Sequence, residues 1–233
     1  MTKAILLDIE GTTTPIDFVH KTLFPFAKVR IGDFVHENFG EIREEISSLE
    51  AEHASDNSYS KNFDDSSPES IAEYLRHLID IDRKSTPLKS IQGKIWKKGY
   101  ESGELKSEVF DDVPRSFERW KSQGKTIAIY SSGSILAQQL LFRHTKYGDL
   151  TKYIDRYFDT TTGAKRDARS YQKIAEELEM EPFETLFLSD IPAELDAART
   201  SGLQTALSIR KGSAEIGEDL TYRTIASFDD VET

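Results

Sequence analysis

The sequence predicts an α/β fold, with a doubly wound, Rossmann-like parallel sheet and an inserted all-helical cap domain. Short apolar runs that are typical of strands buried on both faces recur at residues 4–7, 126–130 and 185–189, with a weaker case at 203–207. After residue 105 these runs alternate with helical patterns, which is typical of a parallel sheet. Before that point, the run at residues 4–7 is followed only by helical patterns, which extend over residues 15–104.

Three helical patterns lie between the later strands. Ser134 is a candidate N-cap for a helix that continues to Leu141. Residues 171–178 carry apolar side chains at i, i+3, i+4 and i+7, which predicts an amphipathic helix. A third helix is predicted from about Ala193, and Gly202 ends it. The sheet is therefore expected to have helices on its faces.

The domain boundaries follow from the place where the alternation is interrupted. We expect residues 1–14 and 105–233 to form the catalytic core and residues 15–104 to form the helical cap. The insert leaves the core at Pro15, shortly after the first strand ends. Ligand sites of open α/β sheets lie at the carboxyl edge of the strands, so an insert at this edge is placed to act as a lid.

Composition restricts the function classes. The formal net charge of −11 gives no general attraction to nucleic acid or to an anionic membrane surface. The chain has no cysteine, which excludes disulfides and thiolate chemistry. No stretch approaches the roughly 20 apolar residues of a membrane-spanning helix. We expect a cytoplasmic protein without nucleic-acid or membrane partners, and a monomer because no association signal is evident.

Polar clusters follow the predicted strands. The carboxyl ends of these strands share one edge of a parallel sheet. The clusters are Asp8-Ile9-Glu10-Gly11-Thr12, Ser131-Ser132, Lys165, and Asp190 with Glu194. Each cluster alone has an ordinary structural explanation, such as a turn, a surface lysine or an acidic first turn of a helix. Their common position after successive strands is harder to explain in that way.

Together these residues satisfy the needs of phosphoryl transfer. Asp8 is a candidate nucleophile, because aspartyl phosphate is an established covalent intermediate. Asp8 and Asp190 offer the hard oxygen ligands that Mg²⁺ prefers, and Mn²⁺ would accept the same ligands. Lys165 supplies a positive charge, and Ser131 leads into a helix N-terminus that suits phosphate. Glu10 is a candidate general acid and base.

The motifs resemble the four motifs of the haloacid dehalogenase superfamily. Glu10 stands where that superfamily usually has a second aspartate. This departure resembles one family closely, the enolase-phosphatases of methionine salvage, also called acireductone synthases. Further segments that carry the resemblance are Thr12-Thr13-Thr14-Pro15-Ile16, Tyr100-Glu101-Ser102-Gly103, and Leu188-Ser189-Asp190 with the following Glu194-Leu195-Asp196-Ala197-Ala198. It covers nearly the whole chain and is thinnest in residues 41–70.

The resemblance implies a bifunctional enzyme that enolises 2,3-diketo-5-methylthiopentyl-1-phosphate and then removes its phosphate. It implies that Asp8 is the nucleophile and that one Mg²⁺ is held by Asp8, the backbone carbonyl of Glu10, and Asp190. The side chain of Glu10 would act as acid and base. Three residues would hold the phosphoryl group and the substrate: Ser131, Ser132 and Lys165.

Other functions remain open at this stage. A phosphatase of the same superfamily could act on a different small phosphate ester. A signalling receiver module also combines Asp, Mg²⁺, Ser or Thr and Lys, but the large helical insert and Asp190 argue against it. The cap aromatics Phe18, Phe24 and Phe26 either contact the methylthio tail or pack the cap's own core. The five histidines show no metal-like spacing.

Overall fold

The computed structural model describes residues 1–210 and 221–232. The chain divides into two compact units, one formed by Met1–Phe18 with Lys106–Thr233 and the other by Val19–Leu105. We call them the core unit and the helical unit. The catalytic and lid roles expected for them stay predictions.

The core unit is built on one parallel sheet with the strand order β3-β2-β1-β4-β5-β6. Its strands are β1 (Ala4–Leu7), β2 (Thr126–Tyr130), β3 (Arg156–Phe158), β4 (Thr185–Ser189), β5 (Gln204–Ser208) and β6 (Thr224–Ile225). The predicted α/β class and parallel sheet are confirmed. Four strands lie where the apolar runs predicted them, whereas β3 and β6 were not predicted. Both are short, and only one residue of each is fully buried, so they lack the continuous apolar pattern.

The register brings the chemistry-bearing strand ends level with one another. Leu7 at the end of β1 pairs with Ile129 of β2 and with Leu188 of β4. One residue later, Asp8 is therefore level with Tyr130 and Ser189. The central strand β1 consequently delivers Asp8 between the ends of its two neighbours, as the parallel pairing predicts.

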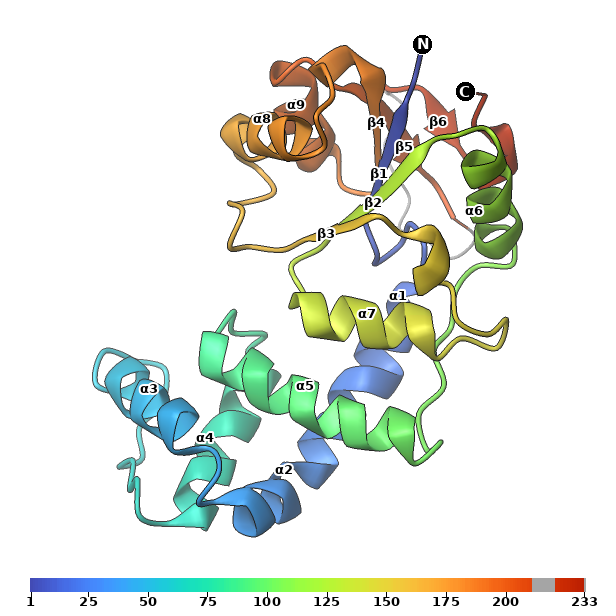
Figure 1. Cartoon of the computed structure of the whole chain (residues 1–233). Coiled ribbons are helices and arrows are strands. Elements are labelled where there is room, and N and C mark those ends of the chain that lie inside the picture. Colours follow the sequence, from blue (N-terminus) through green and yellow to red (C-terminus); the bar gives the residue numbers. More distant parts are fainter. Residues whose placement is uncertain (211–220, 233) are drawn as a thin grey trace. The chain divides into compact units, whose positions relative to one another are not determined.

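Helices cover both faces of the sheet (Figure 1). The helices of this unit are α1 (Ile16–Phe18), α6 (Val113–Ser122), α7 (Ile135–Arg143), α8 (Ala168–Glu177) and α9 (Pro192–Thr200). As predicted, Ser134 caps α7, because its side chain accepts a hydrogen bond from the backbone of Ala137 at 3.3 Å. This cap satisfies one of the orphan amides of the first helical turn.

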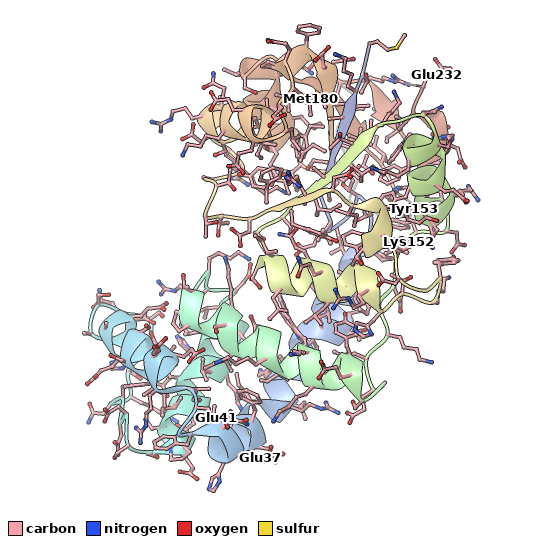
Figure 2. All side chains as sticks on the ribbon, viewed as in Figure 1. Glu37, Glu41, Lys152, Tyr153, Met180 and Glu232 are labelled. Carbon is pink, nitrogen blue, oxygen red and sulfur yellow. The ribbon has the colours of Figure 1, made fainter. Side chains whose placement is uncertain are left out.

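The core between the sheet and the helices α8 and α9 is aromatic and aliphatic. Tyr171 of α8 lies against Tyr130 of β2 and Phe187 of β4, with ring centroids 5.6 and 5.1 Å apart. Met180, labelled in Figure 2, packs against this cluster from the connection that follows α8. On the α6 side, Trp120 is fully buried. These contacts fix the strand ends that carry the polar clusters.

The helical unit is formed by η1 (Val19–Leu23), α2 (Phe24–Asn38), α3 (Arg43–His53), α4 (Pro68–Asp80) and α5 (Thr86–Glu101). Phe24 stacks on Trp96 at 6.3 Å, and the indole of Trp96 donates a hydrogen bond to the carbonyl of Leu23 at 2.9 Å. The side chain of Ser67 caps α4, with Pro68 in its first turn. Phe24 therefore packs within the helical unit itself.

Asp56 organises the connection between α3 and α4. Its carboxylate accepts hydrogen bonds from the backbone and hydroxyl of Ser58 at 2.8 and 2.6 Å, from the hydroxyl of Tyr74 at 3.0 Å, and from Arg83 at 3.0 Å. The hydrogen bonds lower the pKa of Asp56 to about 2, that from Ser58 contributing most. This connection lies in residues 41–70, where the family resemblance is thinnest, and one carboxylate ties it to α4.

Candidate active site

Asp8 lies at the first position after β1 and is buried. Its backbone amide donates to the carbonyl of Leu188 at 3.0 Å, which continues the β1–β4 pairing by one residue. The amide of Ile9 donates to Asp8 Oδ1 at 2.7 Å. A carboxylate that accepts a backbone amide keeps one orientation, so Asp8 is held firmly at the sheet edge.

Lys165 comes from the loop that follows β3, and its ammonium group lies between two carboxylates. Nζ is 2.6 Å from Asp8 Oδ1 and 2.6 Å from Glu194 Oε2. Burial lowers the pKa of Lys165, but the charges of Asp8 and Glu194 outweigh it and the pKa is raised overall. The lysine therefore stays protonated and supplies the positive charge that the sequence predicted at this position.

Glu194 and Ser189 complete this group. The hydroxyl of Ser189 is 3.0 Å from Glu194 Oε2 and 3.2 Å from Asp8 Oδ2, so its single proton is shared between the two carboxylates. Burial, followed by the charge of Asp8, raises the pKa of Glu194 to about 6. Sequence reasoning counted Glu194 in an acidic cluster but gave it no role. Its signal was the spacing of four residues from Asp190 into the first turn of a helix.

Asp190 follows β4 and lies against the turn after β1. Gly11 has a φ of +66°, and a Cβ atom built there would lie 2.2 Å from Asp190 Oδ2. Burial, followed by the negative charge of Asp8, raises the pKa of Asp190 to about 7. The negative charge of Asp8 thus disfavours the ionisation of Asp190, the second carboxylate predicted to bind the metal.

This donor set fits a divalent cation. A cation between buried Asp8 and half-buried Asp190 would offset the repulsion of their charges, and carboxylate and carbonyl oxygens are the ligands that Mg²⁺ prefers. Across the residues that the structure describes, no group of three His, Cys, Asp or Glu side chains is gathered for a metal. The predicted metal site does not need three such side chains, because its third ligand is the backbone carbonyl of Glu10.

Glu10 is half-buried in the turn that follows Asp8. Its backbone pairs with that of Thr14. The amide of Gly11 donates to the carbonyl of Thr14 at 2.9 Å, and the amide of Thr14 donates to the carbonyl of Ile9 at 2.9 Å. These bonds make the turn compact and fix the backbone of Glu10 close to the candidate nucleophile.

Ser131 and Ser132 lie at the end of β2. Ser131 is buried, its amide donates to the carbonyl of Phe158 at 3.2 Å, and its hydroxyl accepts from the amide of Gly133 at 3.1 Å. The side-chain amide of Gln138 donates to the carbonyls of Gly133 and Phe158 at 2.9 and 2.8 Å. The structure therefore forms a rigid Ser131 turn, and Gln138 is a supporting residue to which the sequence alone gave no role.

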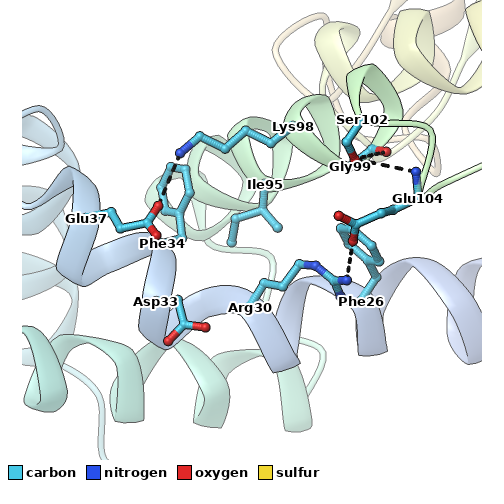
Figure 3. A pocket seen from close by; sticks show the side chains of 10 residues that line it. All are labelled: Phe26, Arg30, Asp33, Phe34, Glu37, Ile95, Lys98, Gly99, Ser102 and Glu104. Carbon is cyan, nitrogen blue, oxygen red and sulfur yellow. Dashed lines mark hydrogen bonds and ion pairs between the residues drawn. The ribbon is translucent and has the colours of Figure 1, made fainter.

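The helical unit has a hollow of its own, of about 320 Å³ (Figure 3). Arg30 lies over the ring of Phe26 and pairs with Glu104. Lys98 lies over the ring of Phe34, and its ammonium nitrogen is 3.7 Å from Glu37. Both cations of this hollow thus already face carboxylates, so it is a poor phosphate site. The charge arrangement in the core unit suits a phosphate ester better.

The fold and the position of its charged groups define a class of protein. A family model described as a haloacid dehalogenase-like hydrolase matches residues 2–202. Among solved structures, the UTR4 protein of Saccharomyces cerevisiae superposes with a TM-score of 0.82 at 34% identity, covering 99% of this chain and 100% of that one. A dehalogenase with a TM-score of 0.56 is 18% identical and shows the fold alone. The class is that of the haloacid dehalogenase-like hydrolases.

Within this class the sequence has close curated relatives. The enolase-phosphatase E1 of Synechococcus elongatus is 50% identical, with 97% of this chain and 96% of that protein covered. The enolase-phosphatase E1 of Leptospira borgpetersenii is 50% identical with 90% of each covered, and that of Drosophila willistoni is 46% identical with 93% and 90% covered. The chain belongs to the enolase-phosphatase E1 family, which confirms the resemblance found in the motifs.

Proposed function

We propose that this chain is a bifunctional enolase-phosphatase of methionine salvage. It enolises 2,3-diketo-5-methylthiopentyl-1-phosphate and then hydrolyses the phosphate ester, giving the acireductone 1,2-dihydroxy-3-keto-5-methylthiopentene. The observation that carries the proposal is the buried contact of 2.6 Å between Lys165 and Asp8 at the carboxyl end of β1. It occurs in a chain that is 50% identical to the Synechococcus enzyme over nearly its full length.

Asp8 acts as the nucleophile of the phosphatase step. A carboxylate oxygen of Asp8 forms a bond to phosphorus while the bond from phosphorus to the substrate oxygen on C1 breaks. The leaving oxygen takes a proton from Glu10. A water molecule then attacks the phosphorus, Glu10 takes the water's proton, and the bond between phosphorus and Asp8 breaks. Inorganic phosphate leaves, and both carboxyl groups return to their starting states.

Lys165 keeps this chemistry electrostatically feasible. An anionic phosphate approaches a site that already holds several carboxylates, so uncompensated negative charge would repel it. Lys165 offsets the charge of Asp8, and with Ser131 and Ser132 it holds the phosphoryl oxygens. The turn at Ser131 precedes the N-terminus of α7, where the helix dipole favours an anion.

The proposed metal site uses Asp8, the backbone carbonyl of Glu10, and Asp190. A bound Mg²⁺ would neutralise phosphate oxygens and polarise a substrate carbonyl, which makes the neighbouring C–H bond more acidic for enolisation. The choice between Mg²⁺ and Mn²⁺ is decided by comparing the two ions in the assay below.

The test follows both steps on the purified full chain. Phosphate release and enediol absorbance are recorded with the diketone phosphate as substrate, with Mg²⁺, with Mn²⁺ and with EDTA. Magnesium-dependent appearance of both signals is expected. Phosphate release from generic esters but not from this substrate would overturn the substrate assignment and leave a phosphatase of the same class. A stable phosphorylated Asp8 without turnover would overturn the enzymatic assignment.

Two further expectations concern the setting of the enzyme. Within residues 1–210 and 221–232, no helix has the length and apolar character required to cross a membrane. A cytoplasmic location stays a prediction, as does the monomeric state. Light scattering at micromolar concentration checks the monomer, which at 26.5 kDa is readily distinguished from a dimer.

A further inference from the structure

Three consecutive backbone carbonyls in the loop that carries Lys165 each accept a hydrogen bond from a side-chain hydroxyl. The hydroxyl of Tyr130 donates to the carbonyl of Gly163 at 2.9 Å, and that of Ser170 donates to Ala164 at 2.8 Å. The hydroxyl of Tyr171 donates to the carbonyl of Lys165 itself at 2.7 Å. We call this arrangement the hydroxyl clasp.

The donors of the clasp are themselves immobile. Tyr130 ends β2, and Tyr171 lies in the first turn of α8; both side chains are fully buried, and Ser170 is nearly so. The two tyrosine rings meet edge to face at 5.6 Å. Hydroxyls fixed by a packed core impose their own positions on the acceptors, because they cannot follow a moving loop.

Gly163 allows the loop to lie this close to α8. Its φ of +153° is rarely adopted by residues with a side chain, and a Cβ atom there would lie 2.2 Å from the hydroxyl of Ser170. The absence of a side chain at residue 163 therefore allows the close contact with Ser170 of α8. The clasp holds the loop there through hydrogen bonds to three successive residues.

A lysine needs such support at this position. Its side chain has many rotamers, and its ammonium group has to lie between Asp8 and Glu194, 2.6 Å from each. Since the side chain is only 10% exposed, water cannot compensate for a misplaced charge. A small shift of the Lys165 backbone would disturb both contacts. The aromatic ring of Tyr130, 5.8 Å from Nζ, adds a second constraint.

We infer that Tyr130, Ser170 and Tyr171 are positioning residues that set the place of the Lys165 ammonium group through the loop backbone. This inference rests on the proposed function, in which Lys165 offsets the charge of Asp8 and binds the phosphoryl group. In this inference the three residues act on the reaction only through Lys165, and this restriction makes the inference testable.

The experiment is a double-mutant cycle on the full chain. Tyr171→Phe removes one clasp hydroxyl and keeps the ring, and kcat/KM for phosphate release is expected to fall roughly tenfold. Lys165→Ala is expected to lower it roughly a thousandfold, with the residual rate measured at raised enzyme concentration. In the double variant, Tyr171→Phe should cause no further loss, because the group it positions is gone.

Ser170→Ala gives a second double-mutant cycle with Lys165→Ala that leaves Tyr171 unchanged. It tests the inference if Tyr171→Phe fails to fold. Ser201→Ala is its control. The hydroxyl of Ser201 is also buried and donates to a backbone carbonyl, that of Ala198, at 2.7 Å in α9. Its loss should leave kcat/KM within about twofold of the unaltered chain.

The outcomes distinguish a failure of the proposed function from a failure of the clasp inference. If Lys165→Ala keeps full activity, the role of Lys165 in the proposed function is wrong, and the inference falls with it. If Lys165→Ala is impaired but the clasp substitutions lower activity by the same factor in both backgrounds, the proposed function stands and the inference is overturned. Non-additive loss together with a silent Ser201→Ala supports the clasp.

Discussion

The ammonium nitrogen of Lys165 lies 2.6 Å from Oδ1 of Asp8. Both side chains are at most 10% exposed, so solvent screens their attraction poorly. Glu194 Oε2 lies at the same distance on another side of the lysine. The lysine is therefore shared between a candidate nucleophile and a carboxylate that only holds it. This sharing leaves the charge of Asp8 partly available for attack.

Substitution of Glu194 tests that sharing. In Glu194→Gln the lysine loses one anionic partner and is drawn more closely to Asp8. The nucleophile is then less available, and we expect kcat/KM to fall roughly 10- to 100-fold, the size of one to two charge-assisted hydrogen bonds. Phosphate release measures the effect. The control is Glu184→Gln, whose carboxylate pairs with the exposed Lys3 at 2.6 Å. A Glu194→Gln enzyme within twofold of the control would contradict the shared-lysine interpretation.

Gly11 tests the closeness of Asp190 to the turn after β1. In Gly11→Ala the new methyl group collides with Asp190 Oδ2, and we expect activity to fall more than about 100-fold with a higher Mg²⁺ requirement. The matched control is Gly124→Ala. Gly124 has a similar φ of +72°, but its Cβ atom would meet nothing within 4 Å.

Both glycine variants carry the same left-handed backbone strain, which costs roughly 1–2 kcal/mol of stability. Only Gly11→Ala adds the collision at the carboxylate. A magnesium titration of phosphate release and a thermal melt of each variant separate the two effects. Equal losses of activity in both variants would show that strain, and not the position of Asp190, is responsible.

Gln138 is expected to matter for substrate binding. Gln138→Leu removes the donor that holds the carbonyls of Gly133 and Phe158, so the Ser131 turn loosens. We expect KM to rise roughly tenfold, since about one to two hydrogen bonds of positioning are lost. Steady-state kinetics well below the melting temperature measure it. Gln204→Leu is the control, because its amide also donates to a backbone carbonyl, that of Phe183. An unchanged KM in Gln138→Leu would remove the turn from substrate binding.

The sequence was most informative where one face or both faces of an element are buried. The strands at 4–7, 126–130 and 185–189 are continuous apolar runs, and the structure has strands at those residues. Edge strands such as β3 have few buried residues, so periodicity had no signal for them. The order of the strands follows from pairing between distant segments, which no local pattern encodes.

The candidate site shows the same division. Asp8 and Asp190 follow predicted strands, and general rules of parallel sheets predicted that they would meet. The supporting partners were not predictable in that way. The apolar pattern of residues 171–178 is the same whether or not the hydroxyl of Tyr171 reaches a loop. The hydrogen bond from this hydroxyl to the carbonyl of Lys165 depends on how α8 packs on the sheet. Side-chain hydroxyls acquire such roles only in three dimensions.

The helical unit offers a prediction on stability and pH. The hydrogen bonds to Asp56, that of Ser58 first, lower its pKa to about 2, below the ordinary value of 3.8. A carboxyl with a lowered pKa stabilises the folded state fully above the unfolded pKa near 4, and this contribution is lost as the pH falls toward 2. We expect Asp56→Asn to lower the free energy of unfolding by about 1–2 kcal/mol at pH 7.

The difference between the unaltered chain and Asp56→Asn should shrink by about half between pH 7 and pH 3, because the unfolded chain then binds the proton that folded Asp56 still rejects. Urea unfolding at several pH values, followed by circular dichroism, measures the difference directly. Asp64→Asn is the matched comparison, since Asp64 also accepts from the backbone and hydroxyl of a serine two residues later, which lower its pKa too, but it lies exposed. Because solvent screens these bonds, a smaller pH-dependent difference is expected for Asp64→Asn. A difference for Asp56→Asn that is the same at every pH would mean that the geometry of its hydrogen bonds, and not its charge, stabilises the connection between α3 and α4.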